Sequence, residues 1–289
     1  MKWIPGIIIL HCLGAPLFSQ TSGIKSQLHI PDSTVVQIIR LHDGTVLNGT
    51  IVEIKEDSIM FQSAVGLVSV PIANIAEIKD IPKSSIVSGE YWFPNPNRTR
   101  LFLGPTGYML EAGKGYFQDI YIFFVGGPVG ITDFLSIGGG FSLVPGAQEQ
   151  LWYVTPKIGF ELSNNVHVAV GTLLMNITGE SDNIGIHYAV GTYGSSDNNI
   201  TGGIGYAFSG GEFADNPVIA IGGQIRGSRS IAFVTENWIV PGDNVTGIFS
   251  FGFRFFGENI SADLAFARST EMSGDGFPFV PYVDFVVNF

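Results

Sequence analysis

The sequence predicts an all-β protein in which a C-terminal transmembrane antiparallel β-barrel of about 12 strands follows a small five-stranded barrel. Charged residues make up only 13% of the 289 residues, roughly half the usual share of a soluble globular protein. After residue 20 no run comes near the roughly 18 apolar residues of a membrane helix, because Gly and polar residues interrupt every stretch. Segments of about ten residues instead alternate apolar with polar positions, as the strands of a membrane barrel do.

The overall charge and the cysteine content exclude several classes of function. A formal net charge of −11 argues against a nucleic-acid partner, whose phosphates require a basic surface. The single cysteine, Cys12, excludes a disulfide framework and a thiolate metal cluster. We therefore expect no nucleic acid, no cofactor and no metal site.

Residues 1–20 have the pattern of a secretory signal peptide. Lys2 provides the positive start, residues 7–10 form an apolar run, and small and polar residues follow up to Gln20. A short membrane anchor is the alternative, but the apolar residues are too few to span about 30 Å of hydrocarbon. The pattern predicts export, and residues 21–34 are expected to be a short linker.

Residues 35–82 are expected to form a separate small β module, because short alternating segments are divided by tight turns such as His42-Asp43-Gly44. The module resembles the SH3-like and Sm-like small barrels. The resemblance is carried by Asp43-Gly44-Thr45, Leu47, Gly49, Ile51, Glu53, Val70-Pro71, Ile75 and Ile78. RNA binding by Sm-like relatives does not carry over to an acidic, exported module. A groove for a periplasmic protein or cell-wall partner is one reading, and we favour a folded spacer. Residues 83–97, rich in Ser, Gly, Pro and Asn, are predicted to be a linker.

Residues 98–289 divide into twelve segments of nine to thirteen residues, bounded by Gly, Asn, Asp, Ser or Pro. Twelve is an even number, as expected of a bacterial barrel, and most of the segments are long enough to cross a membrane when tilted. The predicted strands are 98–106, 115–126, 133–144, 150–162, 165–177, 183–194, 199–210, 217–228, 230–240, 245–256, 260–270 and 278–289.

Alternation within the segments predicts which side chains face lipid and which face the lumen. In the last segment Phe285, Val287 and Phe289 share the outer face, while Asp284 takes the inner one. A terminal Phe closing an aromatic strand resembles the signal read by the outer-membrane barrel-insertion machinery. The connections also alternate between short and long, which predicts short periplasmic turns and longer external loops. A soluble β-sandwich, which also alternates, is the competing interpretation.

The stretch 95–143 resembles the start of an uncharacterised family of outer-membrane β-barrel proteins from Bacteroidota. The shared pattern consists of NPN.TR at 95–100, Pro105, G.GY.Q at 113–118 and G.TD..SIGGG at 130–140, where a dot stands for any residue. The resemblance implies an outer-membrane location and a barrel in contact with the lipid bilayer. It implies no substrate.

Inward polar residues can be paired from the predicted antiparallel register. The short turn at 163–165 places Glu161 opposite His167, and the turn at 257–259 places Arg254 beside Asp263, with Asp284 next to it. Lys157 and Arg226 face the lumen by the same parity. The cluster of Arg254, Asp263 and Asp284 either sets the selectivity of a pore or braces the barrel, and we favour bracing.

An enzyme is not expected. His167 and His187 are predicted to face inward on neighbouring strands, but about 20 Å out of register, so they cannot share a metal. Asp263 and Asp284 could act as an acid and a base, yet Arg254 would keep at least one of them ionised. No set of nucleophile, base and orienting group emerges, and no plug is expected before the barrel.

Two hypotheses for function follow. The first is an outer-membrane barrel that acts as a narrow passive channel for small solutes, since inward Gly203, Gly205 and Ala207 would leave the lumen open. The second is a non-conducting barrel that anchors the periplasmic module. The number of strands does not decide between them. The lumen of a barrel of about 8 strands is filled by side chains, that of a barrel of about 16 strands is an open channel, and twelve lies between.

Overall fold

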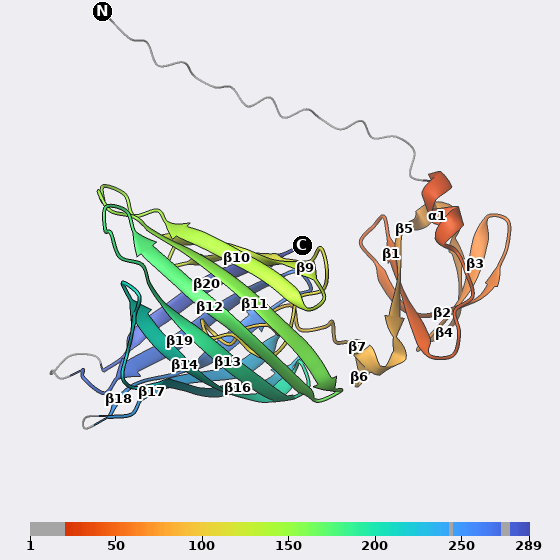
Figure 1. The fold of residues 1–289 in the computed structure, drawn as a ribbon. Helices are drawn as coiled ribbons and strands as arrows, with labels where there is room; N and C mark the ends of the chain where they lie inside the picture. Colours follow the sequence, from red (N-terminus) through yellow and green to blue (C-terminus); the bar gives the residue numbers. More distant parts are fainter. Residues whose placement is uncertain (1–20, 243–244, 273–277) are drawn as a thin grey trace, which may run out of the picture. The chain divides into compact units, whose positions relative to one another are not determined.

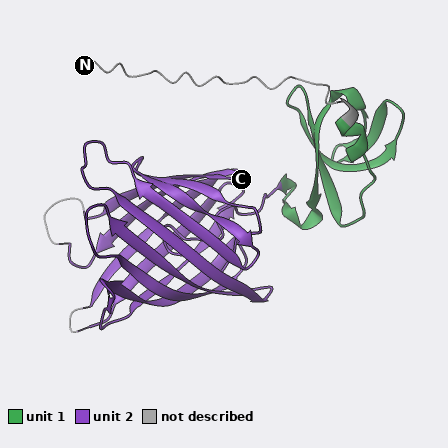
Figure 2. Cartoon of the chain, turned by 45° about the horizontal axis from the view of Figure 1, so that its top comes forward, with its two compact units in different colours: residues 1–90 green, residues 91–289 purple. Residues whose placement is uncertain are grey.

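The computed structural model describes residues 21–242, 245–272 and 278–289 (Figure 1). The chain separates into two compact units, residues 1–90 and residues 91–289 (Figure 2). The predicted leader, residues 1–20, lies outside the described residues. Within the described part, no helix is long and apolar enough to cross a membrane.

The first unit is built on a five-stranded antiparallel sheet with the order β4-β3-β2-β1-β5. A buried core of Ile39, Ile51, Ile59 and Phe61 lies on one face of this sheet. Ile24 of the N-terminal helix packs against the same core, so part of the predicted linker 21–34 is instead a helix of the unit. The elements are α1 (Thr21–Gln27), β1 (Val35–Leu41), β2 (Val46–Ile54), β3 (Ser58–Ser63), β4 (Gly66–Pro71), η1 (Ile72–Asn74), β5 (Ile75–Pro82), η2 (Lys83–Ser85), β6 (Ile86–Val87) and β7 (Glu90–Tyr91).

The second unit is a closed antiparallel β-barrel of twelve strands, which confirms the predicted class and strand number. Its sheet has thirteen members, of which β15 is a two-residue extension beside β14. Pairing of β13 with β14 closes the ring. The strands are β8 (Tyr116–Ile120), β9 (Phe124–Thr132), β10 (Leu135–Ser142), β11 (Leu151–Ser163), β12 (Val166–Ile177), β13 (Ile184–Gly194), β14 (Asn198–Ser209), β15 (Glu212–Phe213), β16 (Val218–Ser228), β17 (Ile231–Val240), β18 (Thr246–Phe256), β19 (Ile260–Ser269) and β20 (Val280–Asn288).

Two of the twelve predicted segments were placed wrongly, and the two errors cancel in the count. Residues 98–106 form no strand of the wall, and the segment 115–126 is divided between β8 and β9 by a turn at 121–123. The first error arises because Arg100 and Phe102 alternate like strand residues although their partners Asp263 and Tyr282 lie inside the barrel. The second arises because the turn is wholly apolar and carries no Gly, Pro, Asn or Asp to mark it.

The outer wall of the barrel is apolar, as the alternation predicts. On β20, Phe285 and Val287 are exposed, whereas Asp284 and Val286, which alternate with them, are buried. On β18, Phe249, Phe251, Phe253 and Phe255 likewise point outward. This is the surface that a barrel wall in contact with lipid requires.

Connections at the two ends of the barrel differ in length. One end, here called the short-turn rim, carries the connections 133–134, 164–165, 195–197, 229–230 and 257–259. The other end, the long-loop rim, carries 143–150, 178–183, 210–217, 241–245 and 270–279, together with the short turn 121–123. The predicted alternation of short and long connections is therefore present, with this one exception.

Candidate functional site: the barrel lumen

A segment without regular strands, residues 92–115 and here called the insert, enters the barrel at the short-turn rim and lies inside it (Figure 1). Part of it was predicted to be a linker and part a wall strand, and both predictions were wrong. At its entry Arg226 Nη1 donates a hydrogen bond of 2.8 Å to the carbonyl oxygen of Phe93. The same guanidinium lies 4.6 Å from the Phe256 ring centroid and pairs with Asp197 at 3.0 Å. Arg226 therefore fixes the point where the chain enters the lumen.

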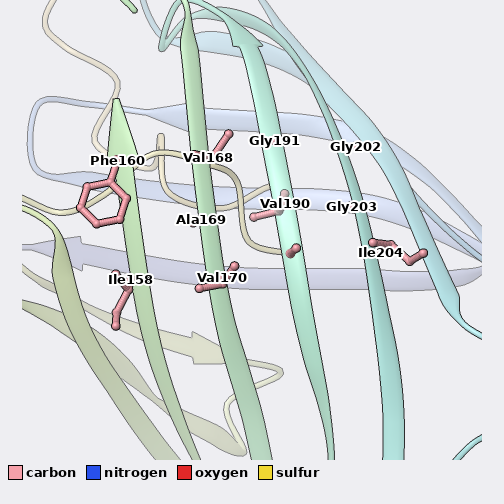
Figure 3. Close-up of a pocket in the computed structure, with 11 residues that line it drawn as sticks. Ile158, Phe160, Val168, Ala169, Val170, Val190, Gly191, Gly202, Gly203 and Ile204 are labelled. Carbon is pink, nitrogen blue, oxygen red and sulfur yellow. The ribbon is translucent and has the colours of Figure 1, made fainter. Parts of the chain in front are cut away.

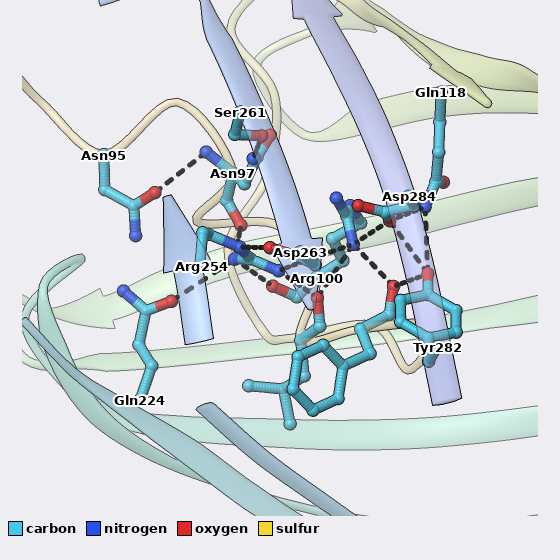
Figure 4. Close-up of polar contacts among 12 residues, drawn as sticks. Asn95, Asn97, Arg100, Gln118, Gln224, Arg254, Ser261, Asp263, Tyr282 and Asp284 are labelled. Carbon is cyan, nitrogen blue, oxygen red and sulfur yellow. Dashed lines mark hydrogen bonds and ion pairs between the residues drawn. The ribbon is translucent and has the colours of Figure 1, made fainter. Parts of the chain in front are cut away.

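Deeper inside, Arg254 holds the insert to the wall (Figure 4). Its Nε and Nη2 donate to the two carboxylate oxygens of Asp263 at 2.7 and 2.8 Å. Its Nη2 also donates to the carbonyl oxygen of Leu101 in the insert at 2.5 Å. Arg254 is fully buried and Asp263 is 1% exposed. A bidentate pair that also bonds the insert acts as a brace between two strands and the segment that they enclose.

Arg100 brings a second positive charge into the same cluster. Its Nη1 lies 3.1 Å from a carboxylate oxygen of Asp263 and 3.1 Å from one of Asp284. The same oxygen of Asp284 accepts hydrogen bonds from the Tyr282 hydroxyl at 2.8 Å and from Gln118 at 2.6 Å. Two arginines and two aspartates balance in charge, which buried ionic groups require. The predicted neighbours Arg254, Asp263 and Asp284 do meet, in the register Arg254↔Asp263↔Asp284.

The tip of the insert is held by a carboxylate that the sequence interpretation overlooked. Glu236 Oε2 accepts hydrogen bonds from the backbone N–H groups of Phe102 (2.8 Å), Leu103 (3.0 Å) and Gly104 (2.9 Å). Its other oxygen accepts from the Trp238 indole at 2.7 Å. A Cβ on Gly104 would lie 2.9 Å from the Trp238 ring, so only glycine fits there. The sequence does contain a sign of this site, because Glu236 is a single acidic residue at an inward position of the predicted strand 230–240.

On the opposite side of the lumen, Lys157 bonds the backbone of the insert. Its Nζ donates to the carbonyl oxygens of Tyr108 at 2.6 Å and Thr99 at 3.5 Å. His167 stacks on the Tyr108 ring with centroids 3.9 Å apart. The predicted register Glu161↔His167 is correct, although Glu161 itself is exposed near the short-turn rim.

These contacts fill the half of the lumen next to the short-turn rim. Each of the twelve wall strands has a buried inward residue, and several of these residues contact the insert directly. The residues are Gln118, Gly130, Ser136, Lys157, His167, Thr192, Thr201, Gln224, Val234, Arg254, Asp263 and Asp284. The expectation that no plug precedes the barrel was therefore wrong, because the insert comes before the first wall strand, β8.

The half next to the long-loop rim is a cavity of about 750 Å³. The tip of the insert forms its floor, and Leu103 at this tip is 60% exposed. Because the other half is filled, solvent reaches Leu103 from the long-loop side. The lining is predominantly apolar and aromatic. Residues that contribute include Phe102, Leu103, Ile120, Tyr121, Phe124, Tyr153, Leu173, Met175, Ile186, Tyr188, Val218, Ala220, Trp238, Ile248, Ala267 and Tyr282.

Polar groups make up a small part of the lining of this cavity and include Gln118, Ser136, Thr155, Thr201 and Ser250. Arg100, Lys157 and Glu236 border it, each already bonded within the lumen. Gly203 and Gly205 also line it, so the expectation that small inward residues leave space holds in this half only. The cavity is thus shaped to hold an apolar molecule rather than a strongly charged one.

A second hollow, of about 530 Å³, lies on the outer wall over β11–β14 (Figure 3). Gly191 and Gly202 leave open space at its floor, and Phe160, Ile158 and Ile204 stand around it. Its lining is apolar, like the rest of the outer wall.

The predicted inward position of His187 was wrong. His187 stacks on Phe208 with centroids 4.8 Å apart, on the outer side of the wall, and bonds Thr172 at 2.7 Å. In the described part of the chain, no group of three or more His, Cys, Asp or Glu side chains lies close enough to hold a metal ion.

Comparisons with known proteins give similarity to solved structures only. No protein-family model matches the sequence, and no curated protein matches it. The chain is similar to the KdgM porin in complex with disordered oligogalacturonate, with a TM-score of 0.43, 7% identity, and coverage of 61% of this chain and 95% of that one. It is similar to the NanC porin with a TM-score of 0.41, 9% identity, and coverage of 61% and 96%. For OprD of Pseudomonas aeruginosa the TM-score is 0.34, the identity 9%, and the coverage 88% and 93%.

Proposed function

We propose that the protein is an outer-membrane barrel that takes a small, largely apolar molecule into the lumen cavity, and that the insert closes the passage below it. The observation that carries this proposal is an apolar cavity of about 750 Å³ whose floor is the insert itself. Cavities of this size bury most of the surface of a small organic ligand. The protein is then a channel that conducts only when the insert moves.

The location follows from the wall. A closed barrel with an apolar outside is one of the two structures that can span lipid, and short turns on one rim favour a periplasmic position for that rim. The insert enters from this side, and outward Phe285, Val287 and Phe289 would serve as the signal for the insertion machinery. Residues 1–20 would direct export, and residues 35–82 would form an SH3-like periplasmic module of a Bacteroidota-type protein. The anchoring hypothesis finds no specific support among the described residues.

Trp238 provides a direct test, because its side chain lines the cavity. In nanodiscs, a chain that keeps only this tryptophan (Trp3→Phe, Trp92→Phe, Trp152→Phe) should lose fluorescence on addition of 4-bromobiphenyl, a heavy-atom quencher. The quenching should saturate. Ala220→Phe, which fills the cavity, should weaken it by about tenfold or more, since a buried aromatic ring displaces much of a small ligand.

The matched control is Ala262→Phe, which adds the same ring on the lipid side of β19. This variant should bind the probe as the parent does. Linear quenching without saturation, equal in the parent and in Ala220→Phe, would contradict a binding cavity. A heat-shift gel verifies that each variant is folded.

A further inference from the structure

One connection on the long-loop rim differs from all the others. The turn Tyr121-Ile122-Phe123 between β8 and β9 has three residues and no charge, and Phe124 follows it directly. Ile122 is 72% exposed. The longer connections on the same rim instead carry charged residues that include Glu149, Glu180, Asp182, Glu212, Asp215 and Glu271. An exposed, uncharged apolar turn is suited to lipid rather than to water.

The barrel wall also extends less far toward the long-loop rim at this turn than at the neighbouring strand β20. The ladder between β20 and β8 begins at Asp284↔Ile120, whereas β20 itself begins four residues earlier, at Val280. Four residues correspond to roughly 13 Å of strand. On its other side β20 stays paired with β19 up to Ala267↔Val280. Beyond the hydrogen bond from the Tyr121 N–H to the Val283 carbonyl, residues 280–282 of β20 have no strand partner on this side among the described residues, and this unpaired stretch of the wall is here called the notch.

The notch leads into the cavity. Ile120 and Tyr121 lie beside the notch and also line the cavity, as does Phe124 at the start of β9. Tyr121 is held against β20 by hydrogen bonds from its N–H to the Val283 carbonyl (3.2 Å) and from its hydroxyl to the Pro281 carbonyl (2.6 Å). Tyr121 and Ile122 both have positive φ angles, 56° and 69°, which non-glycine residues adopt only when surrounding contacts hold them. The shape of the turn is thus fixed by its neighbours.

We propose that the ligand passes between the cavity and the outer leaflet sideways, through this notch. This inference rests on the proposed function and specifies it: the ligand class is lipid-soluble molecules that partition into the membrane, rather than solutes that arrive through water. A continuous apolar path from the lipid-facing turn to the apolar cavity avoids any step in which such a molecule must be hydrated.

The test uses two single-tryptophan chains in nanodiscs made with dibrominated-acyl phosphatidylcholine. Trp152 faces lipid and serves as the reference for direct contact with brominated chains. Trp238, inside the barrel, should be quenched to at least about half the extent of Trp152, because acyl chains enter the notch. The variant Ile122→Asp with Phe123→Asp should reduce the quenching of Trp238 by about threefold or more and leave that of Trp152 unchanged.

A matched variant places the same charges on the neighbouring hairpin, Leu143→Asp with Val144→Asp. These exposed residues lie on the same rim but do not line the cavity, so Trp238 should respond as in the parent. If the aspartates at the notch prevent folding in the heat-shift gel, Ile122→Asn replaces them.

If the aspartates at the notch leave the quenching of Trp238 unchanged, the inference is overturned. The brominated acyl chains would then quench Trp238 across the barrel wall rather than through the notch. The proposed function has its own readout in 4-bromobiphenyl binding. If that binding persists and remains sensitive to Ala220→Phe, the cavity stands and only the lateral route fails. If it is absent as well, the cavity itself binds nothing.

Discussion

The two halves of the barrel lumen share the same twelve strands but hold opposite contents. Next to the short-turn rim, arginines, aspartates and backbone groups of the insert are bonded to one another and buried. Next to the long-loop rim, apolar side chains surround a cavity of about 750 Å³. The difference shows that strand number does not fix what a barrel of this size does, because a segment of 24 residues (92–115) decides whether the lumen is filled.

The largest expected effect comes from removing the part of the insert that fills the lumen. Replacement of residues 98–111 by a short Gly-Ser linker should turn a silent barrel into one with stable ohmic steps in a planar bilayer. The parent chain should show no such steps, because the insert is bonded to buried inward residues of the wall and fills the passage. Steps of equal size in the parent would mean that the insert does not close the lumen. A heat-shift gel separates a folded, silent variant from an unfolded one.

A smaller effect is expected from breaking the buried ion pair. Arg254→Leu and Asp263→Leu should each lower the free energy of unfolding by about 3–5 kcal/mol, since each leaves an uncompensated charge in the buried cluster of two arginines and two aspartates. The double variant should cost less than the sum of the two, as a double-mutant cycle in denaturant would show. Arg268→Leu is the control, because this arginine points outward from β19 and is exposed. Additive losses would contradict a shared network.

The tip of the insert should respond more weakly. Glu236→Gln replaces a carboxylate that accepts three backbone hydrogen bonds by a neutral amide. The expected loss is about 1.5–3 kcal/mol, the range for hydrogen bonds to a charged group. Hydrogen exchange followed by mass spectrometry should show faster exchange of the amides of residues 102–104. Unchanged protection there, with the barrel folded, would show that Glu236 does not hold the tip.

The smallest effect is expected at an exposed ion pair, which contrasts with the buried one in the lumen. The hydrogen bond of the His29 ring to the Gln27 carbonyl, together with Asp80 at 2.8 Å, raises the pKa of His29 above its usual value. A raised folded-state pKa stabilises the first unit below the unfolded-state pKa, and this contribution is lost as the pH rises through the folded-state value. Because both groups are exposed, the change should stay below about 1 kcal/mol.

An NMR titration of His29 in the refolded full chain checks this expectation. The midpoint should lie above that of histidine in an unstructured peptide, and Asp80→Asn should lower it while the Gln27 contact remains. A midpoint at or below the peptide value would contradict the pairing seen here.

The wall of the barrel could be predicted from the sequence because alternation and turn residues report directly on strands. The pair Arg254↔Asp263 followed from the short turn at 257–259, and Asp263↔Asp284 followed from the alternation of the two strands that flank the long loop. The insert could not be predicted in this way. Its alternating Arg100 and Phe102 obey the period of a strand, while their partners Glu236, Asp263 and Tyr282 come from more than 130 residues away. Such contacts leave no local pattern.

Access to the lumen from water tests the central claim most directly. The only native cysteine is Cys12, so a chain with Cys12→Ser accepts single reporters in the insert. Leu103→Cys lies at the exposed tip, and Thr106→Cys replaces a residue that is 1% exposed. In the folded protein a charged, membrane-impermeant maleimide should label Leu103→Cys and leave Thr106→Cys unlabelled until denaturation. Equal labelling of both positions would contradict a lumen that is filled in one half and open in the other.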